Sequence, residues 1–365
     1  MKKQLLKKIQ DQKETIKKIN LREQWLEEVP DILKSCHQVE EIDLTGNYLF
    51  ELPDWLFEFP KLKALHLALN DMESIPKALA KAQHLEKLSI DAPIEGPIPD
   101  VVASLTNLRK LDIVDKIHGF PAGFFDLPYL EELNLHSPAI SNLPEDLSRL
   151  PNLRSFSLSQ IASVYDLDED KKAVPLDAEQ FVAVLSKCSN LRKLDLSGSG
   201  MHTIPKNINI LQQITALHLN TNGISSLPEA LFELTGLETL DLGTNSIGHL
   251  PKEIKFLTNL RNLLLNSNHT PPIVLTNLFN SIQDLPHLQK LALWSCQTKI
   301  EIPETLSEWT SLRELDLDNN KIKTLPKSIK EMTWLKKLRI STNSIPKKEM
   351  EEIVEALKNT QVTAF

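Results

Sequence analysis

Apolar residues recur along this chain at a fixed spacing, and the pattern repeats about every 23 residues. Two distant segments illustrate it, because residues 237–251 read LETLDLGTNSIGHLP and residues 312–326 read LRELDLDNNKIKTLP. Leucines at the fourth and sixth places alternate with polar residues, which predicts a short strand with one buried face. The closing Leu-Pro is followed by further apolar pairs such as Leu56 with Phe59. This predicts a short helical or extended return segment that begins at proline.

Units of this kind follow one another through residues 16–346. With the first apolar residue of each unit taken as position 1, they begin at Ile16, Val39, Leu62, Leu85, Leu108, Leu130, Leu153, Leu191, Ile214, Leu237, Leu260, Leu288, Leu312 and Leu335. A lone unit cannot fold, because burying a few side chains at roughly 1.5–3 kcal/mol each does not offset backbone ordering at roughly 1–2 kcal/mol per residue. The units must therefore stack as a solenoid of parallel strands.

The consensus LxxLxLxxNxLxxLPxxLxxLxx resembles the leucine-rich repeat in its 23-residue form, as found in intracellular Ras-group and Scribble-group scaffolds and in many bacterial repeat proteins. The resemblance implies an α/β fold, namely a right-handed horseshoe solenoid of about 14 repeats with a parallel β-sheet on its concave face. It also implies a non-catalytic scaffold or effector, such as a bacterial effector, that binds a protein on that face without a cofactor. No segment resembles an attached kinase, ligase, PDZ or nucleotide-switch domain, so we expect recognition alone.

Position 9 predicts a structural ladder of side-chain amides. It is filled by Asn47, Asn70, Asn222, Asn245, Asn268, Asn320 and Asn343, with Cys296 as a substitute in one unit. A buried amide at a turn can hydrogen-bond the backbone of its own unit and of the next unit. Between residues 93 and 199 the position holds Pro93, Lys116, Pro138, Ile161 and Ser199, none of which is expected to reproduce those bonds. We therefore expect a less regular middle, where IEGPIP at 94–99 resembles the ending of plant-type repeats.

The spacing of the units also predicts insertions and end caps. The two long steps, of 38 residues after Leu153 and 28 after Leu260, place insertions at about 162–184 and 270–285. The first reads as a loop followed by a helix, and the second as two prolines before a short helix. Residues 1–15 and 347–365 predict helical caps that cover the apolar ends of the solenoid at 16–346.

Charge and cysteine content limit the classes of function. The formal net charge is −8 with both signs interleaved, which argues against nucleic acid as a partner. The lysine-rich residues 1–18 predict a solvated helical cap. No apolar stretch is long enough for a membrane span or a signal peptide, so we expect a cytoplasmic protein, or one exported without a cleavable signal. Cys36, Cys188 and Cys296 have no metal-binding spacing and read as packing residues, so no metal or small-molecule cofactor is expected.

Positions 3, 5 and 7 of each unit should face away from the core. At position 5, Asp43, His66 and Ser89 fall in adjacent units, so an alternative function is a serine hydrolase-like activity. We disfavour it because a triad also needs an oxyanion hole and exclusion of water. A secondary acidic face, suited to a basic partner, is predicted from Asp91, Asp112, Asp115, Asp195 and Asp241.

An apolar patch on the same face predicts the main partner site. Position 5 changes to Leu264 and Ala292, and position 7 of the second of these units is Trp294. Exposed tryptophan beside leucine is typical of an interface hot spot. Asn262, Asn266, Asp316 and Asp318 would form its polar rim. In the alternative arrangement, the insertion at 270–285 folds over Trp294 and buries it.

Overall fold

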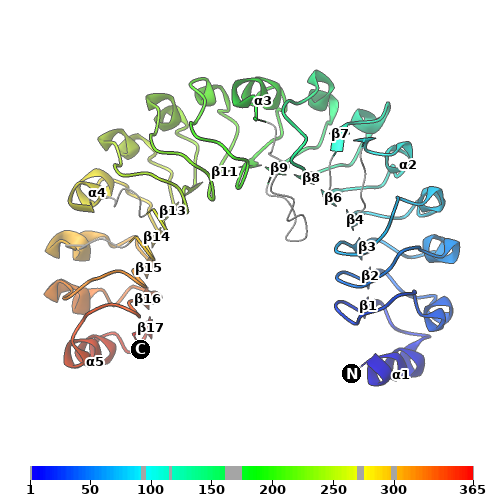
Figure 1. Cartoon of the computed structure of the whole chain (residues 1–365). Coiled ribbons are helices and arrows are strands. Elements are labelled where there is room, and N and C mark those ends of the chain that lie inside the picture. Colours follow the sequence, from blue (N-terminus) through cyan, green and yellow to red (C-terminus); the bar gives the residue numbers. More distant parts are fainter. Residues whose placement is uncertain are drawn as a thin grey trace. The chain divides into compact units, whose positions relative to one another are not determined.

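The computed structural model describes residues 2–91, 96–114, 117–160, 175–268, 275–296 and 302–364. The chain forms two compact units, the first made of Met1–Pro175 with Lys187–Leu191 and the second of Leu176–Ser186 with Arg192–Phe365. Within each unit, strands lie along the inner side and short helices along the outer side (Figure 1). Both units thus have the predicted layers of a solenoid.

The first unit is built on parallel strands that follow chain order. They are β1 (Lys18–Asn20), β2 (Glu41–Asp43), β3 (Ala64–Leu67), β4 (Lys87–Asp91), β6 (Lys110–Val114), β8 (Glu132–His136) and β9 (Ser155–Ser159). Two further strands, β5 (Gly96–Pro97) and β7 (Ile117–Gly119), pair in a small second sheet. The helices are α1 (Lys2–Gln12), η1 (Asp31–Ser35), η2 (Asp54–Glu58), η3 (Lys77–Lys81), α2 (Asp100–Ala103), η4 (Phe124–Asp126) and η5 (Glu145–Arg149), where η denotes a 3₁₀-helix.

The second unit repeats this plan. Its strands are β10 (Lys193–Asp195), β11 (Ala216–His218), β12 (Thr239–Asp241), β13 (Asn262–Leu264), β14 (Lys290–Ala292), β15 (Glu314–Asp316), β16 (Lys337–Arg339) and β17 (Gln361–Thr363), again in chain order. Its helices are α3 (Ala178–Leu185), η6 (Ile208–Ile210), η7 (Glu229–Glu233), η8 (Lys252–Phe256), α4 (Leu275–Ile282), η9 (Glu304–Glu308), η10 (Lys327–Glu331) and α5 (Lys347–Ala356). The strand β17, which pairs with β16, was not expected from the sequence.

The register explains why leucine recurs at position 4. Leu217, Leu240 and Leu263 pair with one another across β11, β12 and β13, and all three are fully buried. Each leucine therefore packs under the same position of the neighbouring repeat. The return segments are mostly 3₁₀-helices whose N-cap is proline in extended conformation, as at Pro53 and Pro251. Proline suits that place because its N–H is not needed there.

The described parts of both insertions form helices on the outer side. α3 begins after Asp177, whose side chain accepts a hydrogen bond from the Gln180 N–H, and it buries Phe181 and Leu185. α4 packs against η8 and buries Leu278 and Ile282. The expected loop at 161–174 and the two prolines near residue 271 lie outside the described residues.

The position 9 asparagines hydrogen-bond backbone groups of two repeats. The Asn245 Nδ2 donates to Leu242 O at 3.0 Å and to Leu219 O at 2.9 Å, and its Oδ1 accepts from the Ile224 N–H at 3.0 Å. Equivalent bonds are made by Asn47, Asn70, Asn222, Asn268, Asn320 and Asn343. The second repeat is the preceding one, so the expected direction toward the next unit was wrong. A left-handed residue at position 8, such as Thr244 with φ of 52°, turns the chain just before the amide.

Two other residues at position 9 make part of this bonding. The Ser199 hydroxyl donates to Leu196 O at 2.7 Å, so the expectation that serine contributes nothing here was wrong. The Cys296 thiol lies 3.4 Å from Leu265 O, the carbonyl that an amide would reach in the preceding repeat. Burial raises the pKa of the Cys296 thiol to about 11, which keeps it a protonated donor at neutral pH.

Candidate functional site

The apolar patch predicted around Trp294 lies on the sheet surface of the second unit, here called the strand face. The Trp294 side chain follows β14 and is 41% exposed, whereas Ala292 at position 5 is buried. Leu264 pairs in register with Ala292 and is half-buried. The described helix of the second insertion packs on η8, on the outer side of its own repeat, and Trp294 stays accessible.

The amides of the predicted rim support the strand face. The Asn262 Nδ2 donates to the Thr239 hydroxyl at 2.9 Å in the neighbouring repeat. The Asn266 amide lies over Gly243, where a Cβ would come within 2.6 Å of its nitrogen. Glycine at position 7 of that repeat is therefore what allows the amide to lie flat against the sheet.

The two carboxylates of the predicted rim differ in their surroundings. The Asp316 carboxylate forms an ion pair with the Arg339 guanidinium at 2.8 Å and has a nearly buried side chain. Asp318, at position 7 beside Trp294 in the next repeat, accepts a hydrogen bond from the Ser341 N–H at 2.6 Å. Burial raises the pKa of Asp318 above its ordinary value of 3.8, because desolvation disfavours the charged carboxylate. Asp318 is thus a partly buried acid without an ion-pair partner among the described residues.

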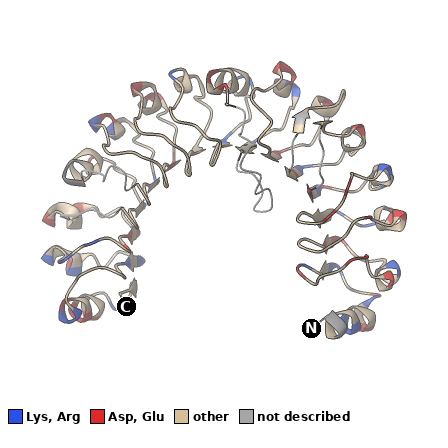
Figure 2. Ribbon diagram, in the orientation of Figure 1, with Lys and Arg blue, Asp and Glu red and all other residues tan. Residues whose placement is uncertain are grey.

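The predicted acidic face divides between the two units. Asp91 and Asp112 lie in the first unit, Asp195 and Asp241 lie in the second, and Asp115 lies outside the described residues. Within the second unit, His218 pairs in register with both of these aspartates, and its Nδ1 is 3.7 Å from Asp241 Oδ2. In Figure 2, acidic and basic residues are interspersed along the strands and helices of each unit.

Some position 5 carboxylates also have a structural role that the sequence analysis missed. The Asp241 Oδ1 accepts a hydrogen bond from the Gly243 N–H at 3.0 Å, which closes a local turn at the end of β12. The same bond is made by Asn20, Asp43, Asp195 and Asp316. The recurrence of Asp or Asn five places after the repeat start was the available signal.

The alternative set Asp43, His66 and Ser89 is brought together as neighbours across β2, β3 and β4. Asp43 uses its Oδ1 to accept from the Thr45 N–H at 2.9 Å. Within the described part of the chain, no hydrogen bond joins any two of these three side chains. The arrangement is a row on a sheet surface, without the bonded contact between nucleophile and base that a triad uses.

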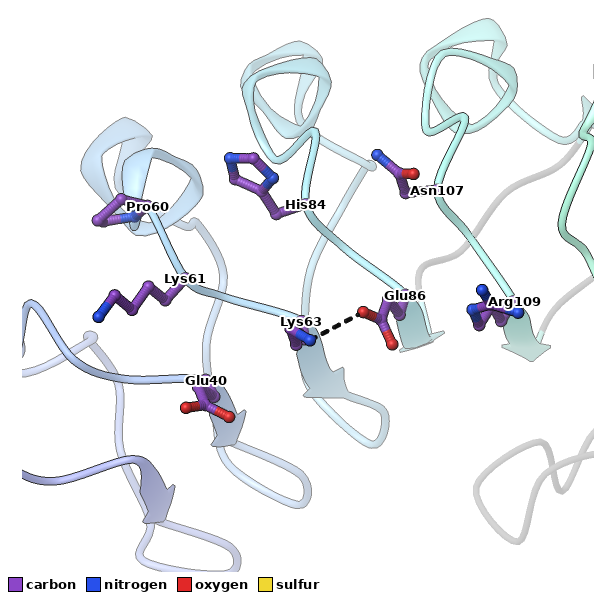
Figure 3. A pocket seen from close by; sticks show the side chains of 8 residues that line it. All are labelled: Glu40, Pro60, Lys61, Lys63, His84, Glu86, Asn107 and Arg109. Carbon is purple, nitrogen blue, oxygen red and sulfur yellow. Dashed lines mark ion pairs between the residues drawn. The ribbon is translucent and has the colours of Figure 1, made fainter.

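A hollow of about 370 Å³ in the first unit contains many charged groups (Figure 3). It is lined by Glu40, Pro60, Lys61, Lys63, His84, Glu86, Asn107 and Arg109. Lys63 forms an ion pair with Glu86 at 3.2 Å, and Arg109 forms one with Glu131 at 2.6 Å. The hydrogen bond from the Lys17 ammonium lowers the pKa of Glu40. Most of these charges are therefore neutralised by a neighbouring repeat.

This row was not noticed in the sequence, although a signal was present. Position 2 alternates in sign through consecutive units as Lys17, Glu40, Lys63, Glu86, Arg109, Glu131 and Arg154. Exposed pairs of this kind contribute little stability each, since solvent screens them. Their regular order favours one stacking register over its alternatives.

The described residues were also searched for metal sites and membrane spans. No group of three His, Cys, Asp or Glu side chains in them could hold a metal ion. None of the helices in the described ranges has the length and apolar character needed to cross a bilayer.

The family comparison matches two segments of the second unit. Residues 212–269 and 286–345 match the leucine rich repeat family. A comparison of the sequence with curated proteins gives no match.

Solved structures with a similar fold come from bacteria and plants. A leucine-rich repeat protein of Leptospira interrogans superimposes with a TM-score of 0.56 at 23% identity, covering 98% of both chains. An internalin of Listeria monocytogenes gives 0.52 at 19% identity, covering 90% of this chain and 84% of its own. The ectodomain of an Arabidopsis thaliana receptor kinase, in complex with CASPARIAN STRIP INTEGRITY FACTOR 2, gives 0.54 at 22% identity, covering 96% of this chain and 47% of its own. At these identities the likeness shows the fold alone.

Proposed function

We propose, from the premise that this chain is a leucine-rich repeat protein, that it is a non-catalytic recognition module of scaffold or effector type that binds a protein on the strand face of its second unit. The observation that carries the proposal is the exposure of Trp294 on that face. Large aromatic side chains at the centre of an interface supply much of its binding free energy. Leu264 extends the apolar surface across the neighbouring strand.

The rim supports a partner that carries a cation. Asp318 is partly buried and lies at the same position as Trp294 in the adjacent repeat. An arginine of the partner could stack on the indole ring and pair with this carboxylate, which would compensate for the cost of its desolvation. Asp316 is less available for this role, because it is already paired with Arg339.

The proposal is tested by affinity capture from a cytosolic extract with the whole protein as bait. We expect a specific protein to be retained by the wild type and to be lost with Trp294→Ala and Leu264→Ala. The matched control is Phe256→Ala, which removes a ring of 53% exposure on the outer side of the same unit. Equal capture by the wild type and both strand-face variants would sink the proposal.

A labelling experiment separates this function from the hydrolase alternative. The protein would be treated with a fluorophosphonate probe that modifies activated serines. We expect no labelling that depends on Ser89, because its hydroxyl has no hydrogen-bonded base in the described part of the chain. Labelling of the wild type that disappears in Ser89→Ala would instead support the enzyme.

A further inference from the structure

The rim of the first unit carries an unusual concentration of exposed aromatic side chains in two consecutive repeats. Trp25 is 75% exposed, Tyr48 is 52% exposed and Phe50 is 58% exposed. Trp25 and Tyr48 both occupy position 10 of their repeats. Trp25 also adopts a left-handed φ of 55°, which is costly for a large side chain. Single exposed aromatics are common, but three together indicate an interaction surface.

Beside these rings lies a groove of about 490 Å³ between the return segments of the same repeats. Its floor contains Val29 and Leu52, which are almost fully buried, and its walls include Phe50 and Trp55. We name it the acidic aromatic groove, because its lining also contains Glu27, Glu28, Asp31 and Glu51 and no lysine or arginine. A second hollow shares Glu27 and Glu28 and extends to Trp25, so the groove and the exposed rings are continuous.

The carboxylates of the groove are unlike the other charges of this unit. Glu27, Glu28 and Glu51 form neither an ion pair nor a hydrogen bond within the described residues, whereas the hollow of Figure 3 is lined by a row of pairs. Acidic groups held around an apolar surface without neutralising cations attract positively charged groups. The charge of the groove therefore complements a basic occupant.

One wall of the groove already binds an ammonium group. The Lys34 Nζ lies 2.8 Å from Asp31 Oδ1 and 5.3 Å from the centroid of the Trp55 ring. A cation held by a carboxylate and an aromatic face is the geometry by which peptides rich in lysine or arginine are recognised. On the opposite wall, Phe50 stands beside Glu27 at the same position of adjacent repeats, without a cation.

We propose that the acidic aromatic groove binds a basic segment of another protein, in which arginine or lysine alternates with apolar side chains. The apolar side chains would contact Phe50 and the groove floor, and the cations would pair with Glu27, Glu28 and Glu51. This surface is separate from the patch at Trp294, so the segment can bind whether or not that patch has its partner.

The test uses the full chain and a fluorescein-labelled peptide of eight alternating arginine and leucine residues, followed by fluorescence anisotropy. We expect Phe50→Ala to weaken binding about tenfold, since an aromatic contact in an interface contributes on this scale. The double variant Glu28→Gln, Glu51→Gln should weaken it by a similar factor and flatten its dependence on salt. All three side chains are exposed, so the variants should retain the thermal midpoint of the wild type.

Matched controls remove equivalent groups elsewhere. Phe256→Ala deletes an exposed ring that lies under a lysine, and Glu229→Gln deletes an exposed carboxylate on η7. Both should bind the peptide as the wild type does, and a peptide of alternating glutamate and leucine should not bind. The proposal is overturned by equal affinity of the groove and control variants, or by equal binding of the acidic peptide.

Sedimentation velocity separates the proposed occupant from a second copy of this chain. The lysine-rich α1 is itself a basic segment, so a copy could in principle occupy the groove. We expect a single species whose sedimentation is the same for the wild type and Phe50→Ala. A dimer that forms with concentration and is lost in Phe50→Ala would overturn the proposal of another protein as the occupant.

Discussion

Two regions of this protein stack the same 23-residue repeat but treat the end of the strand differently. In the second unit, β11 and β12 are three residues long and are followed by a left-handed residue and a buried amide, as at Thr244 and Asn245. In the first unit, β4, β6, β8 and β9 are five residues long, and position 9 carries no such amide. The amide ladder therefore accompanies early strand endings, and longer pairing accompanies its absence.

The difference shows two ways to satisfy the same backbone groups. Buried N–H and C=O groups need partners wherever the chain turns back. In the ladder repeats the amide supplies them, and in the other repeats Val114 and His136 continue the strand pairing. The Ser137 hydroxyl and the Gln160 amide then donate to Ile117 O and Ile140 O at the turn. The predicted loss of regularity in the middle is therefore limited to the ladder.

The largest effect should be common to both regions. Leu133 on β8 and Leu240 on β12 are fully buried at position 4. We expect Leu133→Ala and Leu240→Ala each to lower the free energy of unfolding by about 3–4 kcal/mol, because both leave a cavity in the same kind of core. Urea denaturation followed by circular dichroism measures this. A much smaller loss in one region would break the idea of one shared core.

The next effect should separate the regions. Asn245→Ala removes the partners of Leu219 O, Leu242 O and the Ile224 N–H, so we expect a loss of about 2 kcal/mol. At the same position of a longer-strand repeat, Pro138→Ala should cost less than about 1 kcal/mol, since only chain entropy changes. The same urea experiment compares them. Similar losses would mean that the amides are not what replaces the longer strand.

A smaller difference is expected at position 5. Asp241→Ala removes the acceptor of the Gly243 N–H and should cost about 1 kcal/mol. Asp112 lies within β6, where strand pairing continues, and its carboxylate is 3.4 Å from His136 Nε2 on an exposed face. Asp112→Ala should change stability by less than about 0.5 kcal/mol. Equal effects measured by thermal melting would contradict a role of Asp241 in the turn.

At position 8 the two regions should respond with opposite signs. Thr244 is exposed and left-handed, so Thr244→Gly should raise the free energy of unfolding by about 0.5 kcal/mol through relief of strain. Ser137→Gly should lower it, because Ser137 lies outside the left-handed region and its hydroxyl contacts Ile117 O. Differential scanning calorimetry gives both signs, and a stabilising Ser137→Gly would contradict this account.

The smallest expected effect depends on pH. Because the pKa of Asp318 is raised in the folded state, its ionisation destabilises the fold above the ordinary value of 3.8, and this penalty disappears below it. Asp318→Asn should therefore raise the melting midpoint at pH 7, with a difference from the wild type that shrinks as the pH falls toward 3. Asp112→Asn is the control for removing a carboxylate from a sheet surface. A difference that stays constant with pH would contradict the assignment.

The sequence by itself determined the solenoid, because period and alternation identify one buried face per repeat, and a repeat with so small a core must stack. It also identified the asparagines at position 9, but it assigned their bonds to the wrong neighbour. That direction depends on the turn at position 8, which lies in the backbone conformation and is compatible with Thr, Ser, Leu or Asn.

Only the tertiary structure decided which outward side chains are available to a partner. Asp316 and Asp318 look alike in the sequence, yet one is paired with Arg339 and the other is not, because Arg339 stands beside Asp316 in register across β15 and β16. Likewise, Trp25 and Trp294 are single letters within a repeat until folding places one beside an acidic aromatic groove and leaves the other exposed on the strand face. Leucines act through a local period that can be read along the chain, whereas exposure and pairing depend on what the neighbouring repeats bring alongside.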